Sequence, residues 1–141
     1  MSAPRSDSPL EEAVARVGDR WTLLVVDALL NGPRRFNELA EDVAGIAPNI
    51  LTQRLRHLER EALVFARPYS DRPRRVAYEL TERGRDLAGA LRLLSEWGSS
   101  DAEDPEYLRH TACGSRLAAR WYCETCERAV DETEAVDSEF V

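Results

Sequence analysis

Four side chains in the last third of the chain have the types and spacing of metal ligands. A histidine and a cysteine stand three positions apart, and two more cysteines with the same separation follow after nine intervening residues: His110, Cys113, Cys123 and Cys126. Three thiolates and one imidazole complete the tetrahedral coordination that Zn²⁺ takes in structural sites. We therefore predict a structural Zn²⁺ ion in a small segment with the spacing of a zinc ribbon.

Two alternatives stay open for these residues. The cysteines could be small buried residues with His110 incidental, or Cys123 and Cys126 could form a disulfide that releases the metal. In the second case the segment would sense zinc or redox state. The spacer is shorter than in most zinc fingers, but a small acidic segment cannot bury enough surface to fold alone, which favours a bound metal.

A second set of polar side chains lies on a helix predicted over residues 48–61. Leu51, Leu55 and Leu58 recur at helical spacing and are expected to face inward. The opposite face presents donors and acceptors suited to base edges and phosphates: Asn49, Thr52, Gln53, Arg56 and His57. Residues near the start of a recognition helix reach deepest into the major groove, so the first three are the predicted base contacts. Taken alone, this polar face would equally fit a solvated surface helix.

An arginine-rich loop adds to this pattern. Strands are predicted over 63–67 and 76–80, and the connection 68–75 carries Arg72, Arg74 and Arg75. Such a loop can follow the DNA backbone or insert arginine into a narrow minor groove. Two further arginines precede the third predicted helix and are expected to contact phosphates: Arg34 and Arg35.

Apolar periodicity supplies the elements that position these groups. Leu10, Ala13, Val14 and Val17 predict a first short helix, and Asp19 is expected to cap a second one. That second helix carries an apolar stripe of Trp21, Leu24, Val25, Ala28 and Leu29.

A third short helix carries an apolar face formed by Phe36, Leu39, Ala40 and Val43. Thr81 is expected to cap a last long helix with one face formed by Leu87, Leu91, Leu94 and Trp97. Helices, a strand pair with a cationic loop and a final helix follow the order of a winged helix-turn-helix.

Charge and composition agree with a nucleic-acid-binding body and an acidic tail. The 141-residue chain has a net charge of −7, yet residues 20–85 carry twelve arginines against nine acids, and residues 96–141 carry four against twelve.

No apolar run is long enough for a membrane span and no export signal opens the chain, so we expect a cytoplasmic protein. We expect no enzyme, since the sequence has no HExxH motif, glycine-rich phosphate loop or evident Ser-His-Asp set, and four ligands would close a zinc site.

Four blocks in order resemble the HxlR family of bacterial winged-helix regulators. Residues 18–24 (GDRWTLL), 32–39 (GPRRFNEL), 45–55 (GIAPNILTQRL) and 76–84 (VAYELTERG) are similar to the family patterns GxxWTLLIL, GPxRFxEL, GISxxxLTxRL and VEYxLTxxG. The resemblance covers residues 10–97. It implies a homodimer that binds pseudo-palindromic operators, with the first and last helices at the dimer interface.

Three positions depart from that family pattern. Ala47 stands where the family has serine before the recognition helix, and the missing cap costs about 0.5–2 kcal/mol. Ala62 stands where glycine usually ends the same helix, so the exit turn is expected to differ. Ser8 lies near the place where many members carry a reactive cysteine, and serine cannot form a disulfide or react as a thiolate.

The predicted protein is therefore mainly helical with a small antiparallel β wing, an α+β winged helix-turn-helix followed by a zinc-ribbon-like segment. We expect a flexible start (1–8), a DNA-binding and dimerisation domain (9–97), a linker (98–106) and an acidic Cys/His tail (107–141). The predicted function is sequence-specific binding of double-stranded DNA as a homodimeric repressor with an unknown effector. The alternatives are a winged helix that binds protein, and a regulator whose Cys/His tail senses zinc or redox state.

Overall fold

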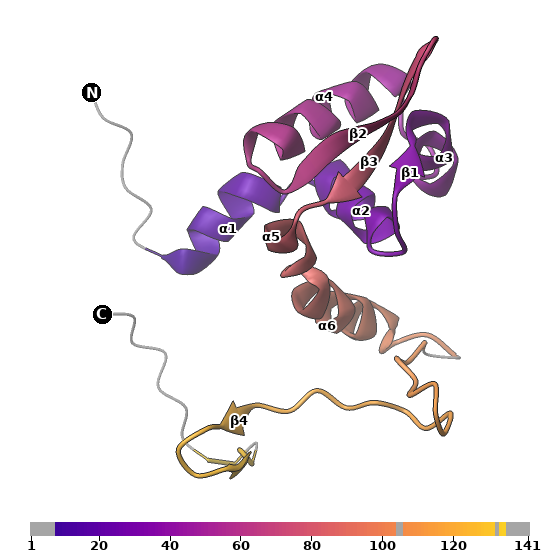
Figure 1. The fold of residues 1–141 in the computed structure, drawn as a ribbon. Coiled ribbons are helices and arrows are strands. Elements are labelled where there is room, and N and C mark those ends of the chain that lie inside the picture. The colour runs from indigo at the N-terminus through magenta and orange to yellow at the C-terminus, as the bar shows by residue number, and fades with distance from the viewer. Residues whose placement is uncertain (1–7, 104–105, 132, 135–141) are drawn as a thin grey trace, which may run out of the picture. The chain divides into compact units, whose positions relative to one another are not determined.

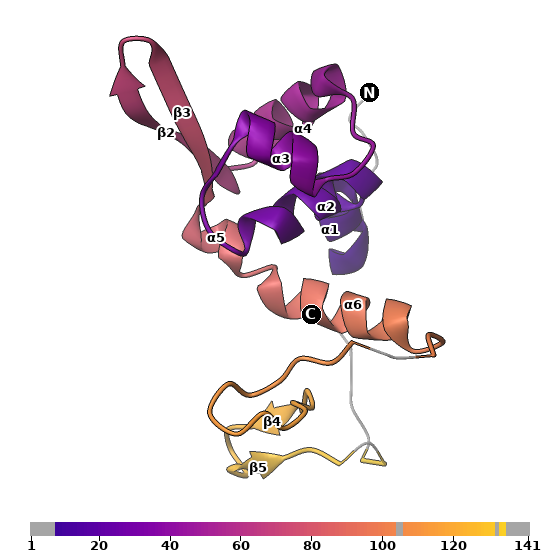
Figure 2. The same ribbon diagram turned by 90° about the vertical axis from the view of Figure 1, so that its right-hand side faces the viewer.

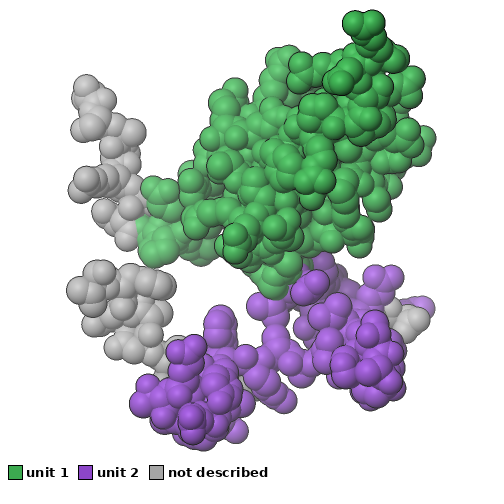
Figure 3. Space-filling view, viewed as in Figure 1, with its two compact units in different colours: residues 1–91 green, residues 92–141 purple. Residues whose placement is uncertain are grey.

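The computed structural model describes residues 8–103, 106–131 and 133–134 (Figure 1). The chain forms two units, Met1–Leu91 and Arg92–Val141, which Figure 3 shows in different colours. Of the predicted flexible start, only Ser8 lies within the described residues, and the last seven residues of the predicted tail lie outside them. Among the described residues, no helix is both long enough and apolar enough to cross a membrane.

The first two helices begin at the capping residues that the sequence provides. Helix α1 (Pro9–Val17) starts at Ser8, whose hydroxyl accepts a hydrogen bond from the Glu11 N–H. Helix α2 (Arg20–Leu29) starts at Asp19, whose carboxylate accepts from the N–H groups of Trp21 and Thr22. The cap predicted at Asp19 is thus confirmed, and the position of Ser8 gives it a role in helix initiation.

Part of the apolar stripe predicted for α2 is wrong. Val25 and Leu29 are buried as expected, but Leu24 is 41% exposed. Thr22 and Val26 are fully buried instead. The buried face of α2 is therefore rotated toward positions 22 and 26, because the helix packs against α4 and the sheet on that side.

Helices α3 (Phe36–Asp42) and α4 (Pro48–Arg60) form the helix-turn-helix. The turn between them contains Gly45 at φ +82°, a conformation that favours glycine. Pro48 occupies the first turn of α4, where its missing N–H costs nothing. Leu51, Leu55 and Leu58 are buried as predicted, so the opposite side of α4 is left to solvent.

The two ends of α4 contain the alanines that depart from the family pattern. Ala47 is the N-cap residue and, as expected, supplies no side-chain hydrogen bond. At the other end the Leu63 N–H donates to Leu58 O, and the Ala62 N–H donates to Glu59 O. These are the two bonds of a Schellman motif, and Ala62 has φ +57° as a glycine would. The expected change in the exit turn is not seen, and Ala62 bears the steric cost instead.

The wing is a longer hairpin than the sequence predicted. Strands β2 (Val64–Asp71) and β3 (Arg74–Leu80) pair antiparallel, so most of the predicted loop 68–75 is strand (Figure 2). Pro68 was expected to end the strand, but β2 is an edge strand, where the missing N–H of proline is tolerated. A third strand, β1 (Arg34–Arg35), pairs with β3 and was not predicted, because two residues carry no alternating pattern.

The predicted last long helix is wrong, since it is broken into α5 (Glu82–Arg85) and α6 (Ala88–Ser99). Thr81 caps α5 as predicted, with its hydroxyl accepting from the Gly84 N–H. The Leu87 N–H then donates to Gly84 O, an i→i−3 bond that interrupts the α-helical ladder. Gly84 is required here because a Cβ would lie 2.2 Å from Leu63 O.

The described residues of the tail form two short antiparallel turns and contain no buried side chain between 106 and 131. Strands β4 (Tyr122–Cys123) and β5 (Arg128–Ala129) make one of these turns, and an isolated bridge between Arg109 and Arg116 marks the other. The segment therefore has no apolar core of its own among these residues.

We predict that Ala62→Gly raises the free energy of unfolding by about 1 kcal/mol, because glycine adopts the left-handed conformation without a Cβ clash. Urea denaturation followed by circular dichroism measures this difference. The control is Ala13→Gly in the middle of α1, which should lower stability by about 1 kcal/mol. A loss of stability in Ala62→Gly would contradict the steric account of the turn.

Candidate nucleic-acid interface

The outer face of α4 carries most of the predicted base-reading residues. Asn49, Gln53 and Arg56 are exposed, and their side chains are open to solvent on this face. Thr52 is half-buried and its hydroxyl donates to Pro48 O at 3.0 Å, which leaves its oxygen lone pairs as acceptors. These four side chains share one face of the helix because they lie opposite the buried leucines.

His57 differs from the other predicted contacts because it has a partner inside the protein. Its Nε2 atom lies 2.7 Å from the carbonyl oxygen of Arg16, at the end of α1. The Arg16 guanidinium also pairs with Glu61 at 2.7 Å. Both contacts join α1 to the C-terminal half of α4, so the structure gives His57 a role in helix packing.

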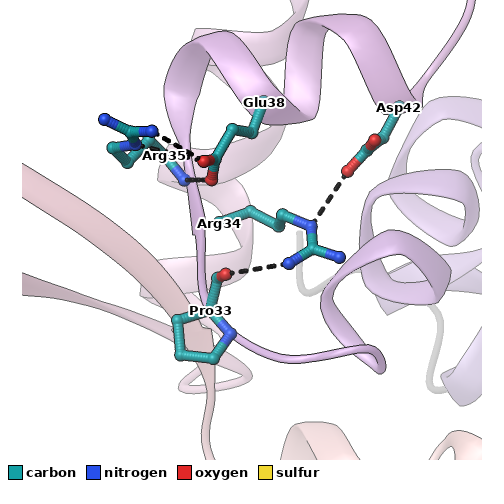
Figure 4. Close-up of polar contacts among 5 residues, drawn as sticks. All are labelled: Pro33, Arg34, Arg35, Glu38 and Asp42. Carbon is teal, nitrogen blue, oxygen red and sulfur yellow. Dashed lines mark hydrogen bonds and ion pairs between the residues drawn. The ribbon is translucent and has the colours of Figure 1, made fainter.

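Arg34 and Arg35 lie at the start of α3, and each faces a carboxylate (Figure 4). The Arg34 Nε atom is 3.1 Å from Asp42, and a second nitrogen donates to Pro33 O. Glu38 accepts from the Arg35 backbone N–H at 2.8 Å and from its guanidinium at 2.9 Å. These hydrogen bonds, the backbone one foremost, lower the pKa of Glu38. Both predicted phosphate contacts are thus partly neutralised in the free protein.

The arginines at the tip of the wing are placed differently. Arg72, Arg74 and Arg75 are all exposed, and no carboxylate in the described part of the chain pairs with them. Nearer the sheet, Arg67 pairs with Glu79 at 3.5 Å. At the tip, Asp71 lies across from Arg74, but no ion pair between them is found among the described residues, so three arginines and one carboxylate leave a net positive charge there. Figure 2 shows the tip of the β2–β3 hairpin projecting from the helices.

Tyr69 is a further polar side chain of this surface that the sequence did not single out. It is 50% exposed on β2 and lines an open hollow with residues from β1, α3 and β3: Arg35, Asn37, Glu38, Glu41 and Arg75. The hydrogen bonds of the Arg35 guanidinium to Glu38 and then to Tyr69 raise the pKa of Arg35. A lone tyrosine in a polar connection gives no periodic signal, so only the pairing of β2 reveals its position.

The four predicted zinc ligands lie in the described tail as two pairs. His110 Nδ1 and Cys113 Sγ are 3.4 Å apart, and Cys123 hydrogen-bonds to Cys126. Hydrogen bonds from Ser115 lower the pKa of Cys113, and those from Cys126 lower the pKa of Cys123. Within the described residues, no three histidine, cysteine or acidic side chains gather around one point.

A helix-turn-helix followed by an antiparallel hairpin with a cationic tip defines a winged helix-turn-helix protein. Residues 16–106 match the model of the HxlR-like helix-turn-helix family, and the chain belongs to this family. The family consists of transcriptional regulators, which confirms the expectation that the protein is not an enzyme.

Relatives and solved structures agree with this assignment. The HTH-type transcriptional regulator Rv3095 of Mycobacterium tuberculosis is 42% identical over 118 residues, which cover 81% of this chain and 74% of the relative. The structure of the redox regulator HypR in its oxidized form is 32% identical, with a TM-score of 0.64 over 69% of this chain and all of that one. The crystal structure of PA1607, named as a putative transcription factor, is 25% identical with a TM-score of 0.76, covering 96% of this chain and 97% of that one.

We predict that His57→Ala lowers the free energy of unfolding by about 1 kcal/mol, because it removes the hydrogen bond that joins α4 to the end of α1. Chemical denaturation measures the change. Gln53→Ala, an exposed change on the same helix, is the control and should stay within about 0.5 kcal/mol of the parent. Equal stability of the two variants would contradict the packing role of His57.

Proposed function

We propose that the protein is a sequence-specific DNA-binding regulator that acts as a homodimeric repressor. Helix α4 reads base edges in the major groove, and the tip of the β2–β3 hairpin contacts the backbone or the adjacent minor groove. Two features of the same unit carry this proposal: the open polar face of α4, and a wing tip where Arg72, Arg74 and Arg75 outnumber the single carboxylate of Asp71 and form no ion pair among the described residues.

The first two turns of α4 supply the specificity in this proposal. Asn49, Thr52 and Gln53 present amide and hydroxyl groups, and an amide can bond the N6 and N7 atoms of adenine at once. Arg56 lies one turn further along and can reach guanine or a phosphate. Because the leucines on the other side of α4 are buried, the helix cannot roll to withdraw these groups from the groove.

The wing supplies affinity that depends little on sequence. A guanidinium without a carboxylate partner gives up no internal ion pair when it binds a phosphate, whereas Arg34 and Arg35 must weaken theirs. We therefore assign the larger share of phosphate binding to Arg72, Arg74 and Arg75, and a smaller share to the two arginines before α3.

Exposed apolar side chains on the first and last helices support a homodimer. Leu10 and Val14 of α1 are 72% and 56% exposed. On α6, Leu94 and Trp97, which share the apolar face predicted for the last helix, are 53% and 78% exposed. Large apolar groups left open in one chain indicate a surface that another chain covers. A two-fold dimer would bind a pseudo-palindromic operator.

We predict that the triple variant R72A/R74A/R75A weakens DNA binding roughly a hundredfold at about 0.15 M salt. The salt slope, which is the slope of the logarithm of the binding constant against the logarithm of the salt concentration, should become shallower by about 0.9 for each phosphate that the variant no longer neutralises. Fluorescence anisotropy with the DNA upstream of the protein's own gene and with a scrambled duplex measures both quantities. Arg67→Ala, in the same hairpin but paired with Glu79, is the control and should change them far less. An unchanged salt slope in the triple variant would instead favour a wing that binds protein.

Replacing an amide of α4 should affect specificity. Gln53→Ala is expected to weaken binding to the preferred DNA by about 1–3 kcal/mol and to leave binding to the scrambled duplex unchanged. Asn31→Ala removes an exposed amide outside the proposed interface and serves as the control. If Gln53→Ala weakened both duplexes equally, α4 would not be the element that reads bases.

A further inference from the structure

The two turns of the tail are built alike, with the same backbone pattern repeated 13 residues apart. In the first, Arg109 bridges Arg116 and the Leu117 N–H donates to Leu108 O at 2.7 Å. In the second, Tyr122 pairs with Ala129, and the Val130 N–H donates to Trp121 O, also at 2.7 Å. Each of these partners in the second turn lies 13 positions after its counterpart in the first.

The candidate ligands occupy equivalent places in these two turns. His110 and Cys123 each follow the first bridged residue, and Cys113 and Cys126 each stand three positions later. In both turns, the residue directly after the second ligand has a left-handed backbone conformation, with φ +71° at Gly114 and +52° at Glu127. A glutamate in this conformation is uncommon, so its presence at the matching position of the second turn indicates a shared geometry.

The first turn already holds its two donors at the separation that a metal requires. His110 Nδ1 lies 3.4 Å from Cys113 Sγ. In a tetrahedral Zn²⁺ site, with bonds of about 2.1 Å to nitrogen and 2.3 Å to sulfur, two such ligands lie about 3.6 Å apart. The backbone supports this placement, since the Cys113 and Gly114 N–H groups both donate to His110 O.

We propose that the two turns close on a single Zn²⁺ ion, which His110, Cys113, Cys123 and Cys126 bind as a structural site. This site is independent of the DNA-binding surface. Each turn supplies two corners of the tetrahedron, and three thiolates with one imidazole leave no position open for catalysis. Since the described residues do not form a cluster of three donors, the turns must approach each other when the metal binds.

The chain between the turns permits this approach. Residues 117–121 have no helix or strand that would hold the turns apart, and closing a loop of about ten residues costs little entropy beyond that of a shorter one. Apolar residues precede the first ligand of each turn by two positions: Leu108, 51% exposed, and Trp121, 78% exposed. Closure around zinc would let these side chains pack, and the metal would replace the core that the segment lacks.

The test is the zinc content of the full chain, purified under reducing conditions without chelator and measured by plasma mass spectrometry. We expect about one Zn²⁺ per chain. His110→Ala and the pair C123S/C126S should each lower the content to a small fraction of that value. Glu124→Gln, which removes a carboxylate inside the second turn, is the matched control and should keep the full content.

Cobalt substitution gives a second readout, because the spectrum of Co²⁺ bound to the parent chain reports the type and geometry of its ligands. Co²⁺ added to the metal-free chain should produce the intense visible absorption of a tetrahedral thiolate site, and the spectrum should disappear in C123S/C126S. The absence of bound zinc, zinc retained in C123S/C126S, one ion per two chains, or a Cys123–Cys126 disulfide in place of the metal under reducing conditions would each overturn the proposal.

Discussion

The burial of one leucine stripe orders the rest of the winged helix. Leu51, Leu55 and Leu58 of α4 are almost completely removed from water against Val25 and Val26 of α2. Three buried leucines contribute several kcal/mol, at about 1.5–3 kcal/mol each, so rotating α4 about its axis is prohibitively costly. The polar face of α4 is therefore fixed by the hydrophobic effect and not by contacts of its own. This constraint leaves the donors and acceptors of α4 open to solvent, as the proposed reading of DNA requires, before any DNA is bound.

The contacts at the ends of α4 extend that constraint to its neighbours. Asp19 caps α2 and also pairs with Arg54 of α4 at 3.1 Å, so one carboxylate links both helices. His57 holds the end of α1. The Schellman turn at Ala62 directs the chain into β2, and the Thr81 hydroxyl donates to Ala62 O at 2.7 Å. The wing is therefore attached to the recognition helix through a short, hydrogen-bonded connection, which sets the position of its arginines relative to α4.

The sequence predicts those features that local chemistry decides, such as the cap at Asp19 and the buried stripe of α4. It misses features that depend on a distant partner. Strand β1 exists only because β3 lies beside it, and Pro68 continues a strand only because β2 is at the sheet edge. The same holds at the candidate interface, where the sequence treats all arginines alike. Only the structure separates Arg34, paired with Asp42, from the arginines of the wing tip, which form no ion pair among the described residues although Asp71 lies across from Arg74.

The proposed dimer places two copies of α4 in successive major grooves. Hydroxyl-radical footprinting on the duplex that the protein selects from a random library tests it most directly. A dimer of this kind should protect two half-sites about 10–10.5 base pairs apart, or a multiple of that, related by two-fold symmetry and flanked by protection from the wings. A single protected site, or uniform protection without a preferred sequence, would contradict it.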